Sequence, residues 1–112
     1  MSEPVLQKLQ SMVREAVEER RGLVVYSRLQ PVEMDRLARQ LERDTLEKIQ
    51  GLLPERTADE RVLGVQRRLE RMRDELTELE EQSVARETSR RIQSDEIVWQ
   101  AFEDIAKLLG VA

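Results

Sequence analysis

The chain contains no cysteine and no histidine among its 112 residues. Without cysteine it can form no disulfide, thiolate metal site or thiol nucleophile. Without histidine it lacks the commonest general base of enzymes and the commonest protein ligand of transition metals. We therefore expect a protein that is not an enzyme, with no catalytic residues, no cofactor and no metal site.

Glycine, proline and aromatic residues are scarce, since the chain has four glycines, three prolines and one residue each of Trp, Tyr and Phe. An all-β chain of this length needs many more turn-forming residues. A chain with so few aromatics also fills only a thin core. The composition therefore predicts an all-α fold, a single helical domain over residues 1–112 built as a bundle of about four helices.

Long apolar runs are missing as well. The uncharged stretch over residues 22–27 is far shorter than the ~20 apolar residues of a membrane-spanning helix. The first four residues, Met-Ser-Glu-Pro, do not have the basic start of a signal peptide. The net charge of −4 disfavours polyanions. We expect a cytoplasmic protein without membrane contact.

Charged residues make up 38% of the chain, and between them the apolar residues recur at helical spacing. The first helix is predicted to begin after Ser2 and to end near Gly22. Residues 23–29 are β-prone but have no second strand to pair with, so they form either a helical or buried connector or a strand shared with another subunit. A second helix is predicted from Pro31 to Gly51, with a kink, a stutter or a new helix start at residues 43–45.

A capping box over Thr57 and Glu60 predicts that the third helix begins at Ala58 and continues to at least Glu81. The polar stretch 86–94 either continues that helix or serves as a hinge or linker. Ser94 is predicted to cap the last helix, which ends at Gly110.

The third helix carries an apolar ridge whose members are three and four residues apart: Val62, Val65, Leu69, Met72, Leu76 and Leu79. Its charges reverse along the helix, because residues 61–73 are rich in arginine and residues 74–81 in acids. An antiparallel partner helix with the same sequence places Arg68 opposite Glu75, whereas a parallel partner sets like charges together. We therefore predict that this long central helix forms an antiparallel coiled coil and that the protein is a homodimer or a higher homo-oligomer.

Two other partners remain open for the ridge. It packs either against the other helices of its own chain, since bundle helices show the same spacing, or against another helical protein. Trp99 lies off the apolar stripe of the last helix, where it serves either as an interface anchor or as the edge of the core.

Residues 57–81, TADERVLGVQRRLERMRDELTELEE, form a predicted capped helix that contains one glycine. This stretch resembles the small helical head and neck proteins of tailed bacteriophages. The resemblance implies a structural or assembly role in a virion, and no catalytic residues.

The leading functional prediction is an oligomerisation, assembly or adaptor protein that acts through protein–protein contacts. The alternative is a small regulator that binds nucleic acid through an arginine-rich helix face, although acidic residues accompany both arginine clusters. Acidic side chains also cluster, but a solvated helix face explains them better than a metal site does. The two arginine clusters are Arg67, Arg68, Arg71 and Arg73, and Arg86, Arg90 and Arg91; the acidic residues are Glu15, Glu18, Glu19, Glu78, Glu80 and Glu81.

Overall fold

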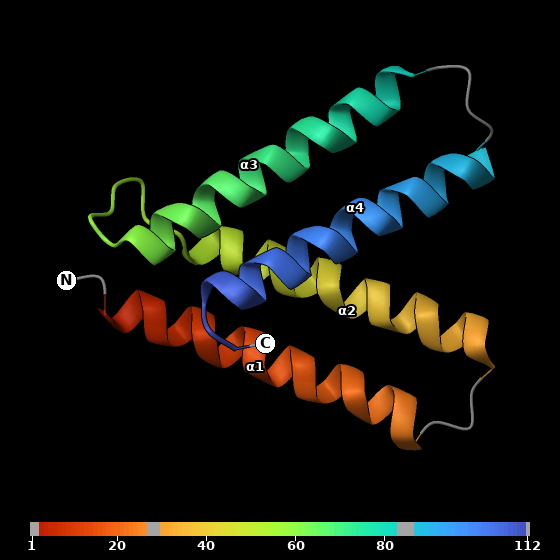
Figure 1. Ribbon diagram of the computed structural model, residues 1–112, viewed down its shortest axis with the longest axis horizontal. Coiled ribbons are helices and arrows are strands. Elements are labelled where there is room, and N and C mark those ends of the chain that lie inside the picture. The colour runs from red at the N-terminus through yellow and green to blue at the C-terminus, as the bar shows by residue number, and fades with distance from the viewer. Residues whose placement is uncertain (1–2, 27–29, 83–86, 112) are drawn as a thin grey trace.

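The computed structural model describes residues 3–26, 30–82 and 87–111. Four helices and no strand account for the regular structure of these residues, which confirms the predicted all-α fold (Figure 1). The helices are α1 (Glu3–Tyr26), α2 (Pro31–Leu52), α3 (Glu60–Glu81) and α4 (Glu87–Leu108). Because α2, α3 and α4 each have 22 residues and α1 has 24, α3 is not a long central helix. None of these four helices is long and apolar enough to cross a membrane.

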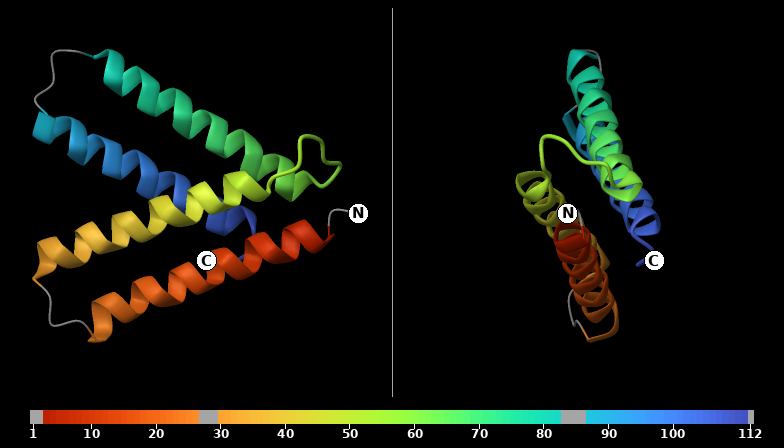
Figure 2. Two further views of the ribbon diagram at one scale, coloured as in Figure 1. Left: turned by 180° about the vertical axis from the view of Figure 1, so that it is seen from behind. Right: turned by 90° about the vertical axis from the view of Figure 1, so that its left-hand side faces the viewer.

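The helices form two antiparallel hairpins, α1 with α2 and α3 with α4 (Figure 1). The hairpins stack as two layers, mainly through contacts of α2 with α4 (Figure 2). The molecule therefore measures 45 × 38 Å across the layers but only 19 Å through them. The hairpins meet where α1 and α3 begin and where α2 and α4 end, and we call this the closed end. They diverge towards the opposite end, which we call the open end.

The core lies mainly at the closed end, where all four helices contribute side chains. Phe102 is the largest wholly buried residue and lies among aliphatic side chains of every helix. Burying each such side chain stabilises the fold by about 1.5–3 kcal/mol before the cost of ordering the chain. The other wholly buried aliphatic residues of this core are Leu9, Val13, Ile49, Val62, Val65, Leu69, Ala101, Ile105, Ala106 and Leu109.

The first residues of α3 and of α4 differ from the prediction. Asp59 is the N-cap of α3, because its carboxylate accepts hydrogen bonds from the N–H groups of Arg61 and Val62. Thr57, the predicted cap, instead accepts a hydrogen bond from the N–H of Asp59. Residues 87–94 belong to α4, so the prediction of a hinge or linker is wrong for these residues. Arg86 lies outside the described residues. Ser94 is therefore an interior residue of α4 and not its cap.

The remaining boundaries follow from local chemistry. The β-prone residues 23–26 are the last turn of α1, which confirms the helical alternative for them, whereas residues 27–29 are not described. Pro31 opens α2 as predicted. At the end of α4, Gly110 has a φ of +72°, and its N–H donates to the carbonyl of Lys107. Glycine adopts this left-handed conformation without strain, and α4 therefore ends here.

Candidate functional site: the open end between the hairpins

The apolar ridge is part of the chain's own core. Val62, Val65 and Leu69 are wholly buried, while Met72 and Leu79 are at least nine-tenths buried and Leu76 packs against them. The antiparallel partner of α3 is α4, in the same hairpin. The prediction that these six residues form a free subunit interface is therefore wrong, and the intramolecular alternative holds. Helical spacing has the same period in both cases and does not distinguish them.

The two charged residues predicted to pair between copies also have partners within the chain. The Nε of Arg68 donates to Asp104 of α4 at 2.7 Å, and this guanidinium holds the pKa of the Asp104 carboxyl below its usual value. Glu75 accepts a hydrogen bond from Arg71, one turn earlier on α3. The predicted pairing of Arg68 with Glu75 of a second copy is thus replaced by contacts within one chain.

Towards the open end, the helix faces that build the core change from apolar to charged. On α2 and on α4 the residues of that face are spaced four, three, four, three and four apart, and in both helices the stripe begins with charged residues and ends with apolar ones. Along α2 and the residue that follows it, these are Asp35, Arg39, Glu42, Leu46, Ile49 and Leu53. Along α4 and the residue that follows it, they are Arg91, Asp95, Val98, Phe102, Ile105 and Leu109.

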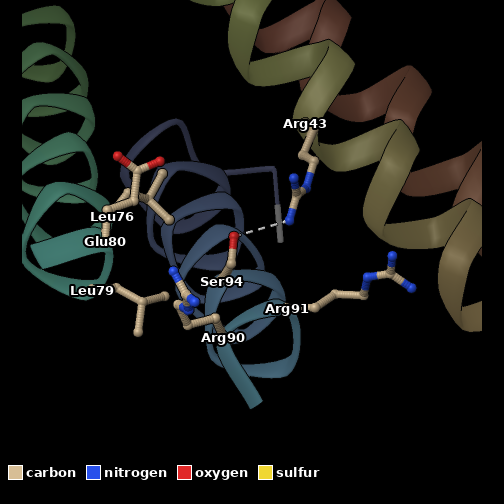
Figure 3. Close-up of a pocket in the computed structure, with 7 residues that line it drawn as sticks. All are labelled: Arg43, Leu76, Leu79, Glu80, Arg90, Arg91 and Ser94. Atoms are coloured by element: carbon tan, nitrogen blue, oxygen red, sulfur yellow. Dashed lines mark hydrogen bonds between the residues drawn. The ribbon is translucent and has the colours of Figure 1, made fainter. Parts of the chain in front are cut away.

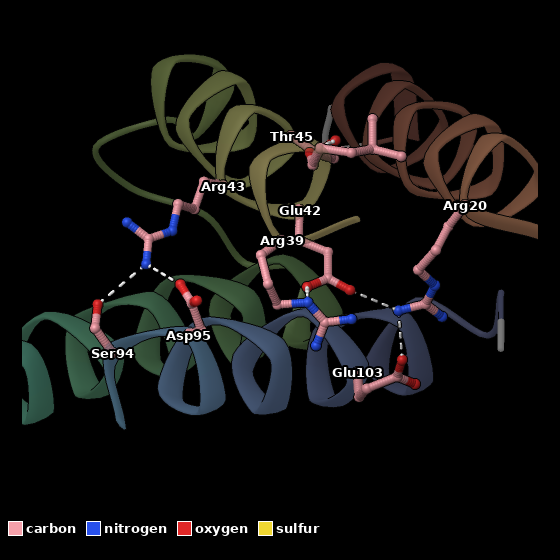
Figure 4. A network of polar contacts seen from close by, with 9 residues as sticks. Arg20, Arg39, Glu42, Arg43, Thr45, Ser94, Asp95 and Glu103 are labelled. Atoms are coloured by element: carbon pink, nitrogen blue, oxygen red, sulfur yellow. Dashed lines mark hydrogen bonds and ion pairs between the residues drawn. The ribbon is translucent and has the colours of Figure 1, made fainter. Parts of the chain in front are cut away.

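Four charged side chains from three helices form what we call the interhairpin cluster: Arg20 of α1, Arg39 and Glu42 of α2, and Glu103 of α4 (Figure 4). Arg20 bridges Glu42 at 2.9 Å and Glu103 at 2.6 Å. The Nε of Arg39 lies 3.0 Å from the other oxygen of Glu42, although the two atoms are not aligned for a hydrogen bond. The cluster therefore ties the two hairpins together by charge instead of by apolar packing.

Burial dominates the electrostatics of this cluster. The carboxylate of Glu42 is wholly buried, which raises its pKa, and the two arginines offset only part of that effect. Burial by itself lowers the pKa of Arg20, but the carboxylates of Glu42 and Glu103 more than offset this and raise it overall. The guanidinium of Arg20 also lies 5.1 Å from the centre of the Phe102 ring, where the charged region meets the apolar core.

A second charged feature, the arginine groove, lies between α2 and α3 with α4 as its floor (Figure 3). Arg43 of α2 enters from one side and donates hydrogen bonds to Ser94 and Asp95 of α4. On α4, Arg90 points towards α3 and Arg91 towards α2. The lining residues of the groove are Arg43, Leu76, Leu79, Glu80, Arg90, Arg91 and Ser94.

The arginine groove continues into a pocket between α2 and α4. This pocket shares Arg43 and Arg91 with the groove and adds Arg36 and Arg39 of α2 to the same positive region. Asp35 and Asp95 also line it, and Asp95 is already paired with Arg43. Arginines thus outnumber acids both in the arginine groove and in this adjoining pocket. The chemistry of this region is therefore suited to anions, in particular to carboxylates or phosphates that arginine can bind through two hydrogen bonds.

Trp99 lies on the other side of the α2–α4 contact, with 39% of its surface exposed. Its ring is 6.0 Å from the guanidinium carbon of Arg39, and the two residues line a groove with apolar residues of α1 and α2. Trp99 thus lies off the buried stripe of α4, and its roles as an interface anchor or as the edge of the core both stay predictions. The apolar residues of this groove, besides Trp99, are Leu23, Pro31, Met34 and Ala38.

The predicted arginine and acidic clusters lie mostly on exposed helix faces, with Arg68 as the exception. Arg68 is buried, whereas Arg67, Arg71 and Arg73 lie exposed on α3. Glu15, Glu18 and Glu19 are exposed on α1, and Glu78, Glu80 and Glu81 on α3. Among the described residues, no group of three or more His, Cys, Asp or Glu side chains is placed to hold a metal ion.

Sequence reasoning missed the interhairpin cluster. The apolar stripe of α2 slips in phase across residues 43–45, which favours a break in the helix, yet α2 is uninterrupted from Pro31 to Leu52. The slip arises because Glu42 and Thr45 occupy buried positions between the two apolar segments. The hydroxyl of Thr45 donates to the carbonyl of Leu41 at 2.8 Å and so remains satisfied inside the helix. The sequence signal for the cluster is therefore this phase slip, in which one acid and one Thr take the buried positions between two apolar segments.

Comparison of the chain with protein-family models, with curated proteins and with solved structures finds no match. The resemblance of residues 57–81 to phage head and neck proteins therefore stays a prediction.

Proposed function

We propose that this chain is a non-enzymatic helical assembly or adaptor protein that acts through protein–protein contacts. The observation that carries the proposal is the arginine groove, an open surface that three helices line with both charged and apolar side chains. Surfaces of this mixed composition are typical of sites that bind protein segments, and arginine is enriched in such sites. A structural role in a virion is one setting for such a protein, in line with the resemblance of residues 57–81.

Association through the apolar ridge is not part of this proposal, because the ridge is occupied by the chain's own helices. Exposed apolar side chains at the open end supply further contact surface. Val32 is 72% exposed on α2 and Ile92 is 57% exposed on α4. Large, exposed apolar side chains beside a polar groove favour a partner that covers them.

The proposal is tested by measuring what the folded protein binds. Light scattering over a range of concentrations gives the absolute mass, and affinity capture from cells of the source organism followed by mass spectrometry gives the partners. We expect a stable oligomer or a reproducible protein partner. The double variant R90E/R91E is expected to lose that partner, whereas R61E/R67E, with the same change in charge on an exposed part of α3, keeps it. A wild-type monomer at every concentration that captures no protein contradicts the proposal.

A further inference from the structure

We infer that the arginine groove binds one amphipathic helix of a partner protein, a helix that carries acidic residues beside a stripe of leucine-like side chains. This inference rests on the proposed function and names the chemistry of the partner. It follows from three features of the groove: the space beside α2, the excess of positive charge and the apolar wall of α3.

The space follows from how the hairpins are stacked. α2 lies against α4, whereas the C-terminal half of α3 extends beyond the α1–α2 hairpin in both views (Figures 1 and 2). The groove is therefore bounded by α2 on one side and α3 on the other, with α4 between them. A helix laid alongside α2 would occupy the same layer as α2 and cover α3. Docking of an amphipathic helix into a groove between helices is a common mode of peptide recognition.

The charges of the groove call for an anionic partner. Among the lining residues that the structure describes, three arginines, Arg43, Arg90 and Arg91, stand against one acid, Glu80. Arg43 is already paired with Asp95, but among the side chains that the structure describes, no carboxylate lies within ion-pair distance of Arg90 or Arg91.

The Nε of Arg90 is, in addition, buried, and it has no hydrogen-bond partner in the described part of the chain. A buried donor without an acceptor is unfavourable. Rotation of the Arg90 side chain towards an acidic residue of the bound helix gives this group a charge-assisted hydrogen bond.

The apolar wall distinguishes a protein helix from a nucleic acid. Leu76 and Leu79 of α3 line the groove together with the arginines. A polyanion would neutralise the arginines but leave these leucines without an apolar partner, and the chain's net charge of −4 repels it at long range. A helix with acids beside an apolar stripe satisfies both sets of side chains at once.

The test uses a fluorescein-labelled peptide of about 20 residues, or about 30 Å as a helix. It carries leucines at positions three and four apart and glutamates on both flanks. We expect it to increase in fluorescence anisotropy with the full-length protein, with a Kd in the micromolar range, and R90E/R91E to weaken binding at least tenfold. R61E/R67E, which alters exposed arginines of α3 outside the groove, is expected to bind as the wild type does.

A variant that binds the acidic peptide more tightly than the wild type excludes unfolding as the cause of the measured change. Glu80 is exposed at the edge of the groove, so E80R adds positive charge without disturbing the core. We expect it to tighten binding of the acidic peptide severalfold, a result that an unfolded variant cannot produce. Circular dichroism of each variant verifies that it remains helical.

Three control ligands decide between the partner classes. They are a peptide with lysine in place of glutamate, a peptide of the same composition with the leucine stripe scrambled, and a DNA duplex. We expect each of them to bind the protein more weakly than the acidic amphipathic peptide does. Equal binding of the scrambled peptide, tighter binding of DNA, or an acidic peptide unaffected by R90E/R91E and E80R would overturn the inference. If the protein still associates with itself or with another protein in that case, the proposed function stands and only the assignment of the groove fails.

Discussion

The closed and open ends of the molecule are built from the same helices and the same helix faces, yet they have opposite chemistry. At the closed end the facing positions of α2 and α4 are Leu46, Ile49, Phe102 and Ile105, all buried. Towards the open end, the same stripes continue as charged residues, and Glu42 is buried among arginines. One end is held by apolar packing and the other by ion pairs.

This difference has an energetic meaning. Apolar packing adds stability in proportion to the area removed from water. A buried ion pair contributes little net stability, because removing the charges from water offsets most of their attraction. The closed end therefore holds the fold together, and the interhairpin cluster fixes how the second hairpin is placed on the first. The open end is left with arginines that have spare hydrogen-bonding capacity, which is what a binding site requires.

The largest effect is expected from removing the central side chain of the closed end. Phe102→Ala leaves a cavity among residues of all four helices, and we expect it to lower the free energy of unfolding by about 3–5 kcal/mol. Urea denaturation followed by circular dichroism measures this loss. Ile92→Ala, at a 57% exposed position of the same helix, serves as the control and is expected to change stability by less than about 0.5 kcal/mol. Equal effects of the two substitutions would contradict the assignment of the core to the closed end.

The next effect is expected from the interhairpin cluster. Arg20→Gln removes the guanidinium that joins Glu42 to Glu103, and we expect it to lower the free energy of unfolding by about 3 kcal/mol because it leaves the buried Glu42 carboxylate without that partner. The double variant R20M/E42M is expected to lose less than R20Q, because it replaces both charges of the pair by apolar side chains and leaves no buried carboxylate behind.

Arg21→Gln, at the exposed neighbouring position on α1, gives the matched control and is expected to be neutral. An R20Q protein as stable as R21Q would show that the cluster does not hold the hairpins together.

Acid titration separates two carboxyls of opposite behaviour. The pKa of Asp104 is lowered by its hydrogen bond from Arg68, so its contribution to stability is present above its usual pKa of 3.8 and is lost as the pH falls through the folded value. The pKa of Glu42 is raised by burial, so the folded state binds its proton more readily than the unfolded state does. Its contribution therefore grows as the pH falls from neutrality towards 4.5.

The two signs are measured by urea denaturation of the wild type, D104N and E42Q between about pH 3 and pH 8. The stability advantage of the wild type over D104N is expected to shrink below about pH 4, whereas its advantage over E42Q is expected to increase as the pH falls from 8. Parallel curves for all three proteins would contradict both assignments.

Much of the fold was predictable because it depends on local chemistry. The scarcity of glycine and proline and the three-and-four spacing of apolar residues predict four helices, and Pro31 and Gly110 mark two of their boundaries correctly. The predictions failed where tertiary contacts overrule local preference. Residues 87–94 are polar, yet they form the first two turns of α4, where Arg90 lies against α3 and Ser94 accepts a hydrogen bond from Arg43 of α2.

The site was less predictable than the fold. The spacing of Leu69 and its neighbours identifies a buried stripe but not the helix that buries it, so spacing alone leaves open both a second copy and the chain's own helices. Arg90 and Arg91 were recognised as a basic cluster, but their meeting with Arg43, more than 40 residues earlier, depends on how the hairpins stack. Long-range pairing of this kind leaves no periodic signal in a single sequence.

The smallest effect is expected from the ion pair of Arg43 with Asp95, which lies beside the interhairpin cluster but is open to water. Its side chains are 38% and 32% exposed, so we expect a coupling of only about 0.2–1 kcal/mol. A double-mutant cycle with R43Q, D95N and the double variant, measured at low and at high salt, gives this coupling energy. It is expected to fall with salt, whereas the loss caused by R20Q changes little, since the Glu42 carboxylate that loses its partner is wholly buried. A salt-independent coupling as large as the effect of R20Q would mean that the open end is as closed to water as the core is.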